Sequence, residues 1–510
     1  MASGVWVLMA AAKIRMASGS ETPAVCASRI RVTSDSSMSG PPVGPLSPYG
    51  RDLATPRSFL VGGLVRIPQR GPRFLPRTES AFTTIPIDRG VTLHHRRSDR
   101  FKTELVRVFF RAPLDDRRTE RHLFAALLGR GTGSTPTRRD LAARMQDLYG
   151  AGYGASVQRL SGRHVLGLRA STVSGRWLPG RPKNLRSLLQ FLSEALQGPP
   201  IGPDGLPIED VFEQERRTLL RDLQSRITNK SRYAMDRLRQ EMFKGQVFAD
   251  PDIGRAEDIQ GAERAACLAE GMRVLSEGEA DIYLLAPCTP LQAEKLIRKH
   301  LALAPRRRER LMRPPLAAPR RRPRRVTEAL DIEQGKLALG FRVEDWEPGE
   351  SHRESLLADV ILGGGPTSKL FRNVREARSL CYDVRSTLDR NLGVWTVTAG
   401  IKPAMCDEAL TAIRAEIRAM KAGHITAEEV DTARRAILSG LRAVPDSQSS
   451  LVEFFFRRRL TKRREKTVEA VARSYARASV TAIPDLMARL RLDTVFFLDS
   501  VGQVEATVGA

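Results

Sequence analysis

The sequence predicts an α+β protein with two domains of one topology, each a mainly antiparallel sheet covered on one face by helices. Three observations support this prediction. Strand and amphipathic-helix patterns recur in the same order in both halves of the chain. Pro136-Thr137 and Pro366-Thr367 open helices at matching places, which indicates an internal duplication. Residues 305–326, rich in arginine and proline, lack an apolar period and read as a linker.

These observations divide the 510 residues into four parts. Residues 1–82 are rich in serine, proline, glycine and arginine and are predicted to be a disordered tail. An N-terminal domain, 83–304, and a C-terminal domain, 327–510, flank the linker at 305–326. An apolar content of 41% is sufficient for two proper cores.

The first half begins with alternating apolar residues that are typical of strands, and amphipathic helices follow. Strands are predicted at 91–96, 103–111, 152–159, 164–170 and 281–285. Helices are predicted at 117–128, 137–148, 184–196 and, as one long element, 209–243.

The same kinds of element return after the linker. The predicted strands are 335–343, 381–388, 393–401 and 494–498. The predicted helices are 352–362, 366–378, 406–421, 426–442 and 447–459, with a glycine turn at 363–365 between the first two.

The net charge of +25 permits nucleic acid or an anionic membrane as a partner. The basic residues are scattered and aromatic residues make up only 6%, so solvated basic faces are the favoured explanation. Five widely spaced cysteines without a Cys-x-x-Cys pair fit a reducing, cytoplasmic compartment. The apolar stretch 5–12 is too short to span a membrane, and no basic segment precedes it as in a signal peptide.

His122-Leu-Phe-Ala-Ala126 has the spacing of a helical zinc motif without its chemistry. Such a motif needs imidazoles four residues apart on one helix face and a carboxylate that takes a proton from metal-bound water. Here Ala125 stands where the carboxylate would be and Ala126 where the second imidazole would be. A methyl group can neither bind zinc nor accept a proton.

The pattern resembles the His-x-x-Glu-His motif of the insulinase (pitrilysin, inverted zincin, M16) peptidase family. A longer match supports the resemblance: Gly363-Gly-Gly-Pro-Thr-Ser-Lys-Leu-Phe-Arg-Asn-Val-Arg-Glu376 followed by Ser379-Leu-Cys-Tyr382, and, in the first half, Phe243–Phe248 with Pro251–Gly254. The chain is similar to bacterial insulinase-like proteins without a zinc site and to the non-catalytic subunit of the mitochondrial processing peptidase. The resemblance implies two M16-type domains and a catalytically inactive homologue.

The resemblance also assigns roles to single residues. The family's third zinc ligand falls on Asp222, seven residues after Glu215, and aspartate is one methylene shorter than the usual glutamate. His122 and Asp222 alone are too few to hold zinc, so no metal cofactor is expected. Arg375 and Tyr382 match positions that reach toward bound substrate in active relatives, and are therefore candidate peptide-binding residues.

In the family, two halves close around an extended peptide, and this chain supplies one half. The resemblance therefore implies a scaffold or peptide-binding subunit that pairs with an active M16 paralogue. One alternative is an active zinc peptidase that recruits His94, His95 or His164. Another is a basic nucleic-acid- or ribosome-associated protein that uses the linker, Arg457–Arg459, Lys462, Arg463 and Arg464.

Overall fold

The computed structural model describes residues 81–301, 303–306, 318–347, 352–461 and 467–500, all of which lie in one compact unit, Phe74–Ala510. Four features from the sequence fall wholly or mainly outside these residues. They are the tail predicted for 1–82, the apolar stretch 5–12, the central part of the linker at 307–317, and the basic residues Lys462, Arg463 and Arg464.

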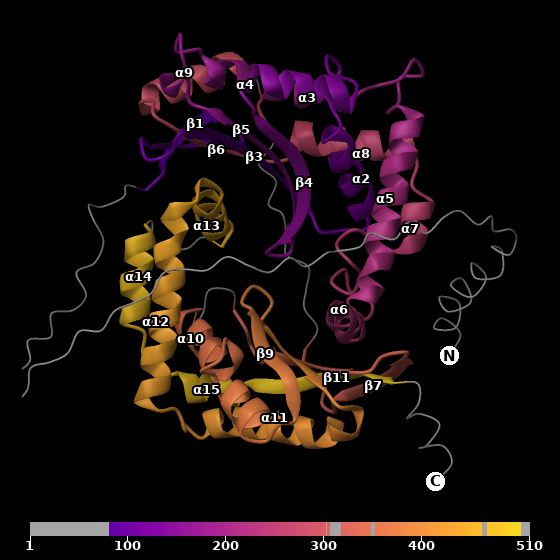
Figure 1. Ribbon diagram of the computed structural model, residues 1–510, viewed down its shortest axis with the longest axis vertical. Helices are drawn as coiled ribbons and strands as arrows, with labels where there is room; N and C mark the ends of the chain where they lie inside the picture. The colour runs from indigo at the N-terminus through magenta and orange to yellow at the C-terminus, as the bar shows by residue number, and fades with distance from the viewer. Residues whose placement is uncertain (1–80, 302, 307–317, 348–351, 462–466, 501–510) are drawn as a thin grey trace, which may run out of the picture. The chain divides into compact units, whose positions relative to one another are not determined.

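The described residues form two sheets (Figure 1). The first has six strands in the order β1-β2-β6-β3-β5-β4: β1 (Thr83–Asp88), β2 (Val91–Arg97), β3 (Thr103–Pro113), β4 (Gly152–Leu160), β5 (Arg163–Val173) and β6 (Ala280–Ala286). The second has five in the order β7-β11-β8-β10-β9: β7 (Arg324–Leu330), β8 (Gly335–Val343), β9 (Cys381–Asp389), β10 (Val394–Ile401) and β11 (Leu490–Ser500).

The two sheets have the same topology, which confirms the predicted duplication. The order β2-β6-β3-β5-β4 in the first sheet corresponds to β7-β11-β8-β10-β9 in the second. The first pair of each series is parallel and the remaining pairs are antiparallel. β1 is an additional edge strand of the first half. Both sheets are therefore mainly antiparallel, as predicted.

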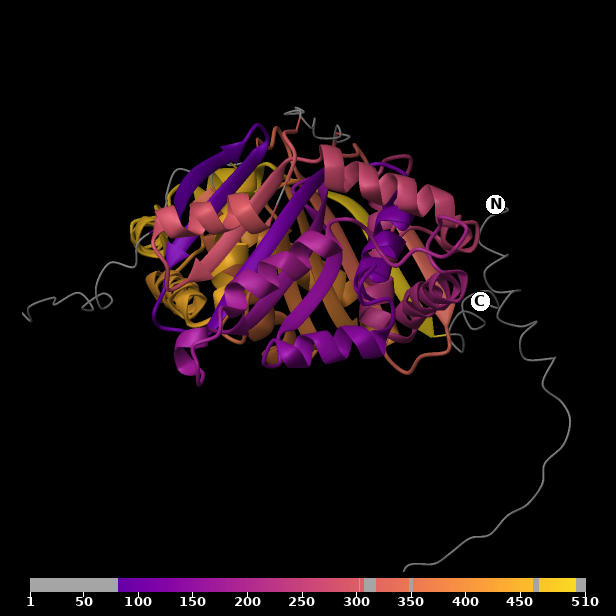
Figure 2. The same cartoon turned by 90° about the horizontal axis from the view of Figure 1, so that it is seen from above.

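Helices surround the sheets, and Figure 2 shows the first half's helices lying across its strands. In the first half they are α2 (Arg118–Leu128), α3 (Arg138–Asp147), α4 (Asn184–Ala195), α5 (Glu209–Thr228), α6 (Lys230–Met242), α7 (Ala256–Gln260), α8 (Arg264–Glu277) and α9 (Pro290–His300). In the second half they are α10 (His352–Gly363), a π-helix (Phe371–Glu376), α11 (Cys406–Lys421), α12 (Ala427–Ala443), α13 (Gln448–Leu460), α14 (Val468–Ala476) and α15 (Ile483–Ala488).

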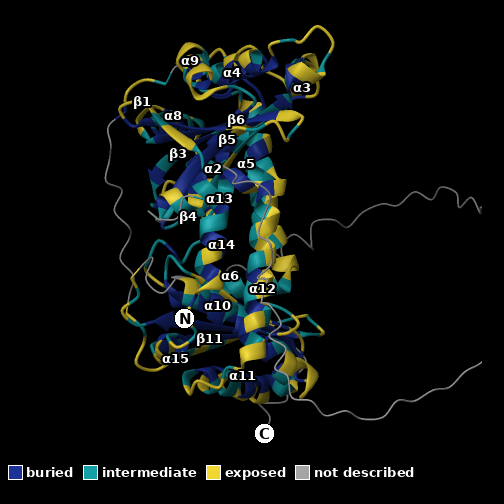
Figure 3. Ribbon diagram, turned by 90° about the vertical axis from the view of Figure 1, so that its left-hand side faces the viewer, coloured by how far each residue is buried: buried dark blue, intermediate teal, exposed yellow. Residues whose placement is uncertain are grey.

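Each half buries one face of its sheet under its own helices. In β3, the alternate residues Val106, Val108 and Phe110 pack into the core that includes α2, α4, α8 and α9. In β8, Leu337, Leu339 and Phe341 pack likewise against α10, α11, α12 and α15. Figure 3 shows the strands mostly buried and the helices with exposed residues on their outer faces.

The other face of each sheet receives a helix from the opposite half. Phe109 of β3 and Tyr283 of β6 lie in one core with Phe456 of α13. Reciprocally, Phe496 of β11 lies in one core with Leu238 of α6. The expectation of helices on one face of each sheet is therefore correct for each half's own helices, and the opposite face is partly covered by the exchanged helix (Figure 1).

Three of the predicted boundaries differ from the structure. The helix predicted at 209–243 is two helices, because Asn229 leaves the helical conformation and its Oδ1 accepts a hydrogen bond from the Arg232 N–H at 3.0 Å. The helix predicted at 366–378 is regular only near the π-helix Phe371–Glu376. β7 begins at Arg324, inside the stretch assigned to the linker.

Candidate functional site

His122 lies on α2, the helix that carries the degenerate motif. Its Nδ1 is 2.9 Å from the carbonyl oxygen of Arg118. A carbonyl can only accept, so Nδ1 carries the proton and donates, and the ring's lone pair is on Nε2. Burial lowers the pKa of His122, which favours the neutral ring. His122 can therefore offer one nitrogen to a ligand.

The next two positions of the motif offer none. Ala125 is 3% exposed and packs in the first-half core with Phe124 and Leu128. Ala126 is half-buried on the same helix. The turn that would supply a base and a second imidazole instead supplies methyl groups to helix packing.

Asp222, the position of the third ligand, is exposed on α5. Glu215, one of the residues that identify this stretch, is buried and forms an ion pair with Arg130. Within the described ranges no group of three or more His, Cys, Asp or Glu side chains could hold a metal ion. The residues present do not fit zinc.

Positive side chains surround His164, the imidazole that lies next to His122. The rings of His122 and His164 lie 5.8 Å apart, edge to face. Arg121 Nη1 donates to His164 Nδ1 at 3.4 Å, and burial together with His122, Arg121, Arg118 and Arg159 lowers the pKa of His164 to about 2. A dication placed here would meet guanidinium repulsion in a poorly solvated site.

The other imidazoles considered as zinc ligands are used elsewhere. His94 Nε2 lies 2.9 Å from Asp281 Oδ1, and His95 Nε2 lies 3.6 Å from the thiol of Cys288. Among the described residues, no hydrogen bond or ring contact joins either of them to His122 or His164. The structure therefore brings His164, but neither His94 nor His95, to the degenerate motif.

Arg375 and Tyr382 lie seven residues apart in the second half, on the π-helix and on β9. Arg375 is exposed on the π-helix, and its guanidinium stacks 4.4 Å from the centre of the Phe371 ring. Tyr382 is 55% exposed near the start of β9, which is an edge strand of the second sheet. No ion pair or side-chain hydrogen bond to the described residues occupies either group. Both are available to a ligand.

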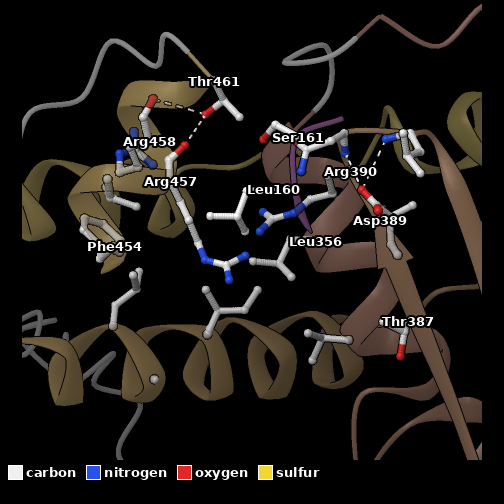
Figure 4. A pocket seen from close by; sticks show the side chains of 18 of the residues that line it. Leu160, Ser161, Leu356, Thr387, Asp389, Arg390, Phe454, Arg457, Arg458 and Thr461 are labelled. Atoms are coloured by element: carbon white, nitrogen blue, oxygen red, sulfur yellow. Dashed lines mark hydrogen bonds between the residues drawn. The ribbon is translucent and has the colours of Figure 1, made fainter. Parts of the chain in front are cut away.

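A cavity of about 800 Å³, which sequence reasoning missed, lies between the two halves (Figure 4). The β4–β5 turn and Phe248 of the first half border it, and α10, the β9–β10 turn, α12, α13 and α14 of the second half complete it. Its wall residues come from positions between Arg159 and Tyr475. No local motif could have revealed it, because its walls meet only in the folded chain.

A second missed feature is the buried carboxylate of Asp281 on β6. It accepts hydrogen bonds from His94 and from Arg459 Nε of α13, at 2.6 Å for the latter, and it also pairs with Arg111. Because these three partners hold the charged form, the pKa of Asp281 is lowered despite its burial. An aspartate inside a strand predicted to be buried was the available sequence signal.

Several of the described basic residues of the nucleic-acid alternative have partners within the chain, whereas Arg321 and Arg322 of the linker are exposed. Arg457 pairs with Glu453 at 2.7 Å, Arg459 pairs with Asp281, and Arg458 stacks on Phe454. From the linker, Arg306 is buried and donates to the carbonyl oxygen of Gly278 at 2.9 Å. In the part of the chain that the structure describes, no helix is both long and apolar enough to cross a membrane.

Known proteins resemble this chain in sequence and in fold. Residues 275–437 match the family model "Peptidase M16 inactive domain". "Probable inactive metalloprotease YmfF" of Bacillus subtilis (strain 168) is 26% identical over 410 residues, which are 80% of this chain and 96% of that protein.

Two crystal structures share the fold. A conserved protein from Enterococcus faecalis V583 aligns with a TM-score of 0.77 and 24% identity, over 82% of this chain and 99% of its own. A peptidase M16 inactive domain from Pseudomonas fluorescens aligns with a TM-score of 0.66 and 17% identity, over 82% and 98%. The resemblance predicted from the sequence is confirmed: part of the chain matches the M16 inactive domain, the chain is similar to a probable inactive metalloprotease, and it lacks the His-x-x-Glu-His motif.

Proposed function

We propose that the chain is the non-catalytic, peptide-binding subunit of a two-chain assembly whose other subunit is an active M16 paralogue. The observation that carries the proposal is the contrast between the two sets of site residues. On the metal side, Ala125 and Ala126 fill the motif and Asp222 is exposed on a neighbouring helix. On the substrate side, Arg375 and Tyr382 remain exposed and uncommitted.

The chemistry of the substrate side fits a peptide. The Arg375 guanidinium can donate to a backbone carbonyl or a carboxylate, and the Tyr382 hydroxyl can donate to a carbonyl oxygen. β9 is an edge strand, so its outer N–H and C=O groups can pair with an extended segment. This chain would orient the peptide in the cytoplasm without zinc of its own, and the paralogue would supply the metal and hydrolysis.

Co-expression with an M16 peptidase of the same genome that retains His-x-x-Glu-His tests the proposal. We expect a complex on size-exclusion chromatography and cleavage of a fluorogenic peptide by the complex but not by this chain alone. Arg375→Ala and Tyr382→Phe should leave the complex intact and slow cleavage by about tenfold, since each removes a hydrogen bond to substrate. Arg372→Ala, an exposed neighbour on the same π-helix, is the matched control.

Two results would contradict the proposal. One is peptide cleavage by the purified chain alone that stops on chelation and returns with zinc. The other is failure to pair with any intact M16 peptidase of the genome while Arg375→Ala and Arg372→Ala behave alike.

A further inference from the structure

The cavity between the two halves has an apolar wall. Along α12 and its C-cap, Ala436, Ile437, Gly440, Leu441 and Val444 recur at helical spacing on the side that lines it. Half-buried apolar side chains of α10, β9, the β9–β10 turn and α13 add to the lining: Leu356, Val360, Leu388, Leu392 and Phe454. A volume of about 800 Å³ accommodates several side chains of a bound ligand.

The four arginines that line the same cavity all have partners within the chain. These contacts are Arg159 with Asp252 at 3.2 Å, Arg390 with the Tyr475 hydroxyl at 3.2 Å, Arg457 with Glu453 at 2.7 Å, and Arg458 with the centre of the Phe454 ring at 5.4 Å. Because each guanidinium is already engaged, an anionic ligand would have to displace these contacts. The arginines therefore do not favour a charged occupant.

The acidic side chain in the lining, Asp389, is committed as well. Its Oδ1 accepts from the backbone N–H groups of Asn391 at 2.9 Å and Leu392 at 3.2 Å. It thereby holds the β9–β10 turn in shape. With the arginines and this carboxylate engaged, and an apolar wall beside them, the lining favours an uncharged ligand.

Two uncharged polar side chains in the lining are open to a ligand. Ser161 lies in the β4–β5 turn and Asn391 in the β9–β10 turn, and these turns occupy equivalent places in the two duplicated sheets. Neither side chain makes a hydrogen bond with the described residues. A hydroxyl and an amide can each donate and accept, so both suit the N–H and C=O groups of a peptide backbone.

This combination favours an apolar peptide over a fatty acid. The carboxylate of a fatty acid would find its possible cations engaged, and its hydrocarbon chain would cover Ser161 and Asn391 without bonding to them. A peptide brings uncharged amides for these two side chains and apolar side chains for the α12 wall.

We infer that this cavity binds an uncharged, apolar segment of a peptide, with side chains against α12 and backbone amides at Ser161 and Asn391. The inference rests on the proposed function, because it names the class of peptide that the subunit would select. It adds a binding site between the two halves of the chain, apart from Arg375 and Tyr382.

Fluorescence anisotropy with the purified full chain tests the inference. The probe is a fluorescein-labelled decapeptide of alternating leucine and serine, and the comparators replace either leucine by glycine or serine by glutamate. We expect the leucine–serine peptide to bind at least about tenfold more tightly than the glycine–serine peptide, because only the former buries apolar side chains. Its affinity should stay within about twofold as salt is added, because it forms no ion pair. The leucine–glutamate peptide should bind no more tightly than the leucine–serine peptide.

Gly440→Phe blocks the cavity. Nothing lies within 4 Å of a Cβ placed on Gly440, and removing a helical glycine does not endanger folding, which circular dichroism checks. The variant should weaken binding of the leucine–serine peptide at least about tenfold, whereas Ser439→Phe, an exposed neighbour outside the lining, should not. Asn391→Ala should weaken it about threefold, because it removes one uncharged hydrogen bond. Arg457→Gln should change it by less than about twofold, because that charge is already paired.

Equal binding of the leucine–serine and glycine–serine peptides, tighter binding of the leucine–glutamate peptide, or unchanged binding by Gly440→Phe would overturn the inference. So would binding of dodecanoate, sensitive to Gly440→Phe, when no peptide binds, because the cavity would then be a fatty-acid site. These failures are distinct from failure of the proposed function. In that case the chain would not pair with an M16 peptidase, whatever the cavity binds.

Discussion

Ala125 shows why loss of the metal site goes beyond two missing ligands. Its methyl group is part of a close-packed core, and the space that a carboxylate and its water would need is filled. The nearby buried guanidinium of Arg118, 2% exposed, adds a like charge where a dication would sit.

We therefore expect the double substitution Ala125→Glu, Ala126→His not to restore zinc binding. The glutamate introduced at position 125 should lower the free energy of unfolding by about 2–4 kcal/mol, because a larger, charged group would be forced into a close-packed core. Urea denaturation measures the stability, and elemental analysis after zinc soaking measures the metal. Ala126→His alone is the milder control. One zinc per chain in the double variant, with a raised melting temperature, would show that the site is only two residues from function.

The buried imidazoles predict a pH dependence of stability. Burial lowers the pKa of His95 to about 4 and that of His164 to about 2, whereas an unfolded imidazole titrates near 6.5. As pH falls below about 6.5, the unfolded chain binds protons that the folded chain does not. The contribution of these neutral rings to stability is therefore fully present above pH 6.5. As the pH falls below that value, each ring lowers the free energy of unfolding by on the order of 1 kcal/mol per pH unit.

Urea unfolding between pH 8 and pH 4.5 measures this slope. His164→Asn should reduce the slope, and His424→Asn, at an exposed position, should leave it unchanged. A stability that is flat from pH 6.5 to pH 4.5 in the unsubstituted chain would contradict the assignment of neutral buried rings.

At the scale of elements, α13 is a helix of the second half that packs on the first sheet. Phe456 stacks on Phe109 with ring centroids 3.9 Å apart and an interplanar angle of 6°. Around this contact, Arg107 Nη1 reaches Glu453 at 3.2 Å and Arg459 reaches Asp281. An aromatic contact thus lies among charged pairs that fix the helix on the sheet.

Phe456→Ala should lower the free energy of unfolding by about 3–5 kcal/mol, because it opens a cavity in a fully buried contact. Phe455→Ala, at a half-buried position on the same helix, should cost less. Chemical denaturation followed by circular dichroism compares the two. Equal losses would mean that α13 is held by its charged residues and not by the stacked ring.

The elements also show what the sequence could predict. Central strands such as β3 and β8 were predictable because they alternate or run continuously apolar. β1 and β7 were not predicted, since they lie at sheet edges, are only partly buried and lack a strong apolar pattern. The break at Asn229 was not predicted because apolar residues continue on both sides of it. α6 there turns onto the second sheet, a tertiary contact that no local pattern encodes.

Some parts of the candidate site could likewise be predicted from the sequence, and others could not. The degenerate motif and the exposed pair Arg375 and Tyr382 could be located from local spacing. The cavity could not, because its walls come from distant segments, and neither could the pairing of Arg459 with Asp281.

At the scale of the whole unit, the exchanged helices α6 and α13 make the two halves depend on each other. Arg237 Nε of α6 donates to Glu328 of β7 at 2.7 Å, and Arg342 of β8 donates to the Met242 carbonyl at 2.6 Å. Together with the α13 contacts, these place part of each half's core in the other half.

We therefore expect one cooperative unfolding transition for the full chain, seen together by tryptophan fluorescence and far-ultraviolet circular dichroism. A fragment of residues 81–306 should bind the dye ANS strongly and aggregate, since Phe109 and Tyr283 would lose their cover. A well-folded monomeric fragment, or two separate transitions, would show that the halves are independent domains.

One turn of α13 faces two directions. Phe456 and Arg459 hold the first sheet, while Arg457 and Arg458, between them in sequence, line the cavity. A ligand in the cavity would therefore contact the same helix that packs on the first sheet. Binding would stabilise the packing of α13 on the first sheet. Trypsin should therefore cleave the ligand-bound chain more slowly than the free chain. Ligand binding and the stability of the contact between the two halves would then depend on the same helix.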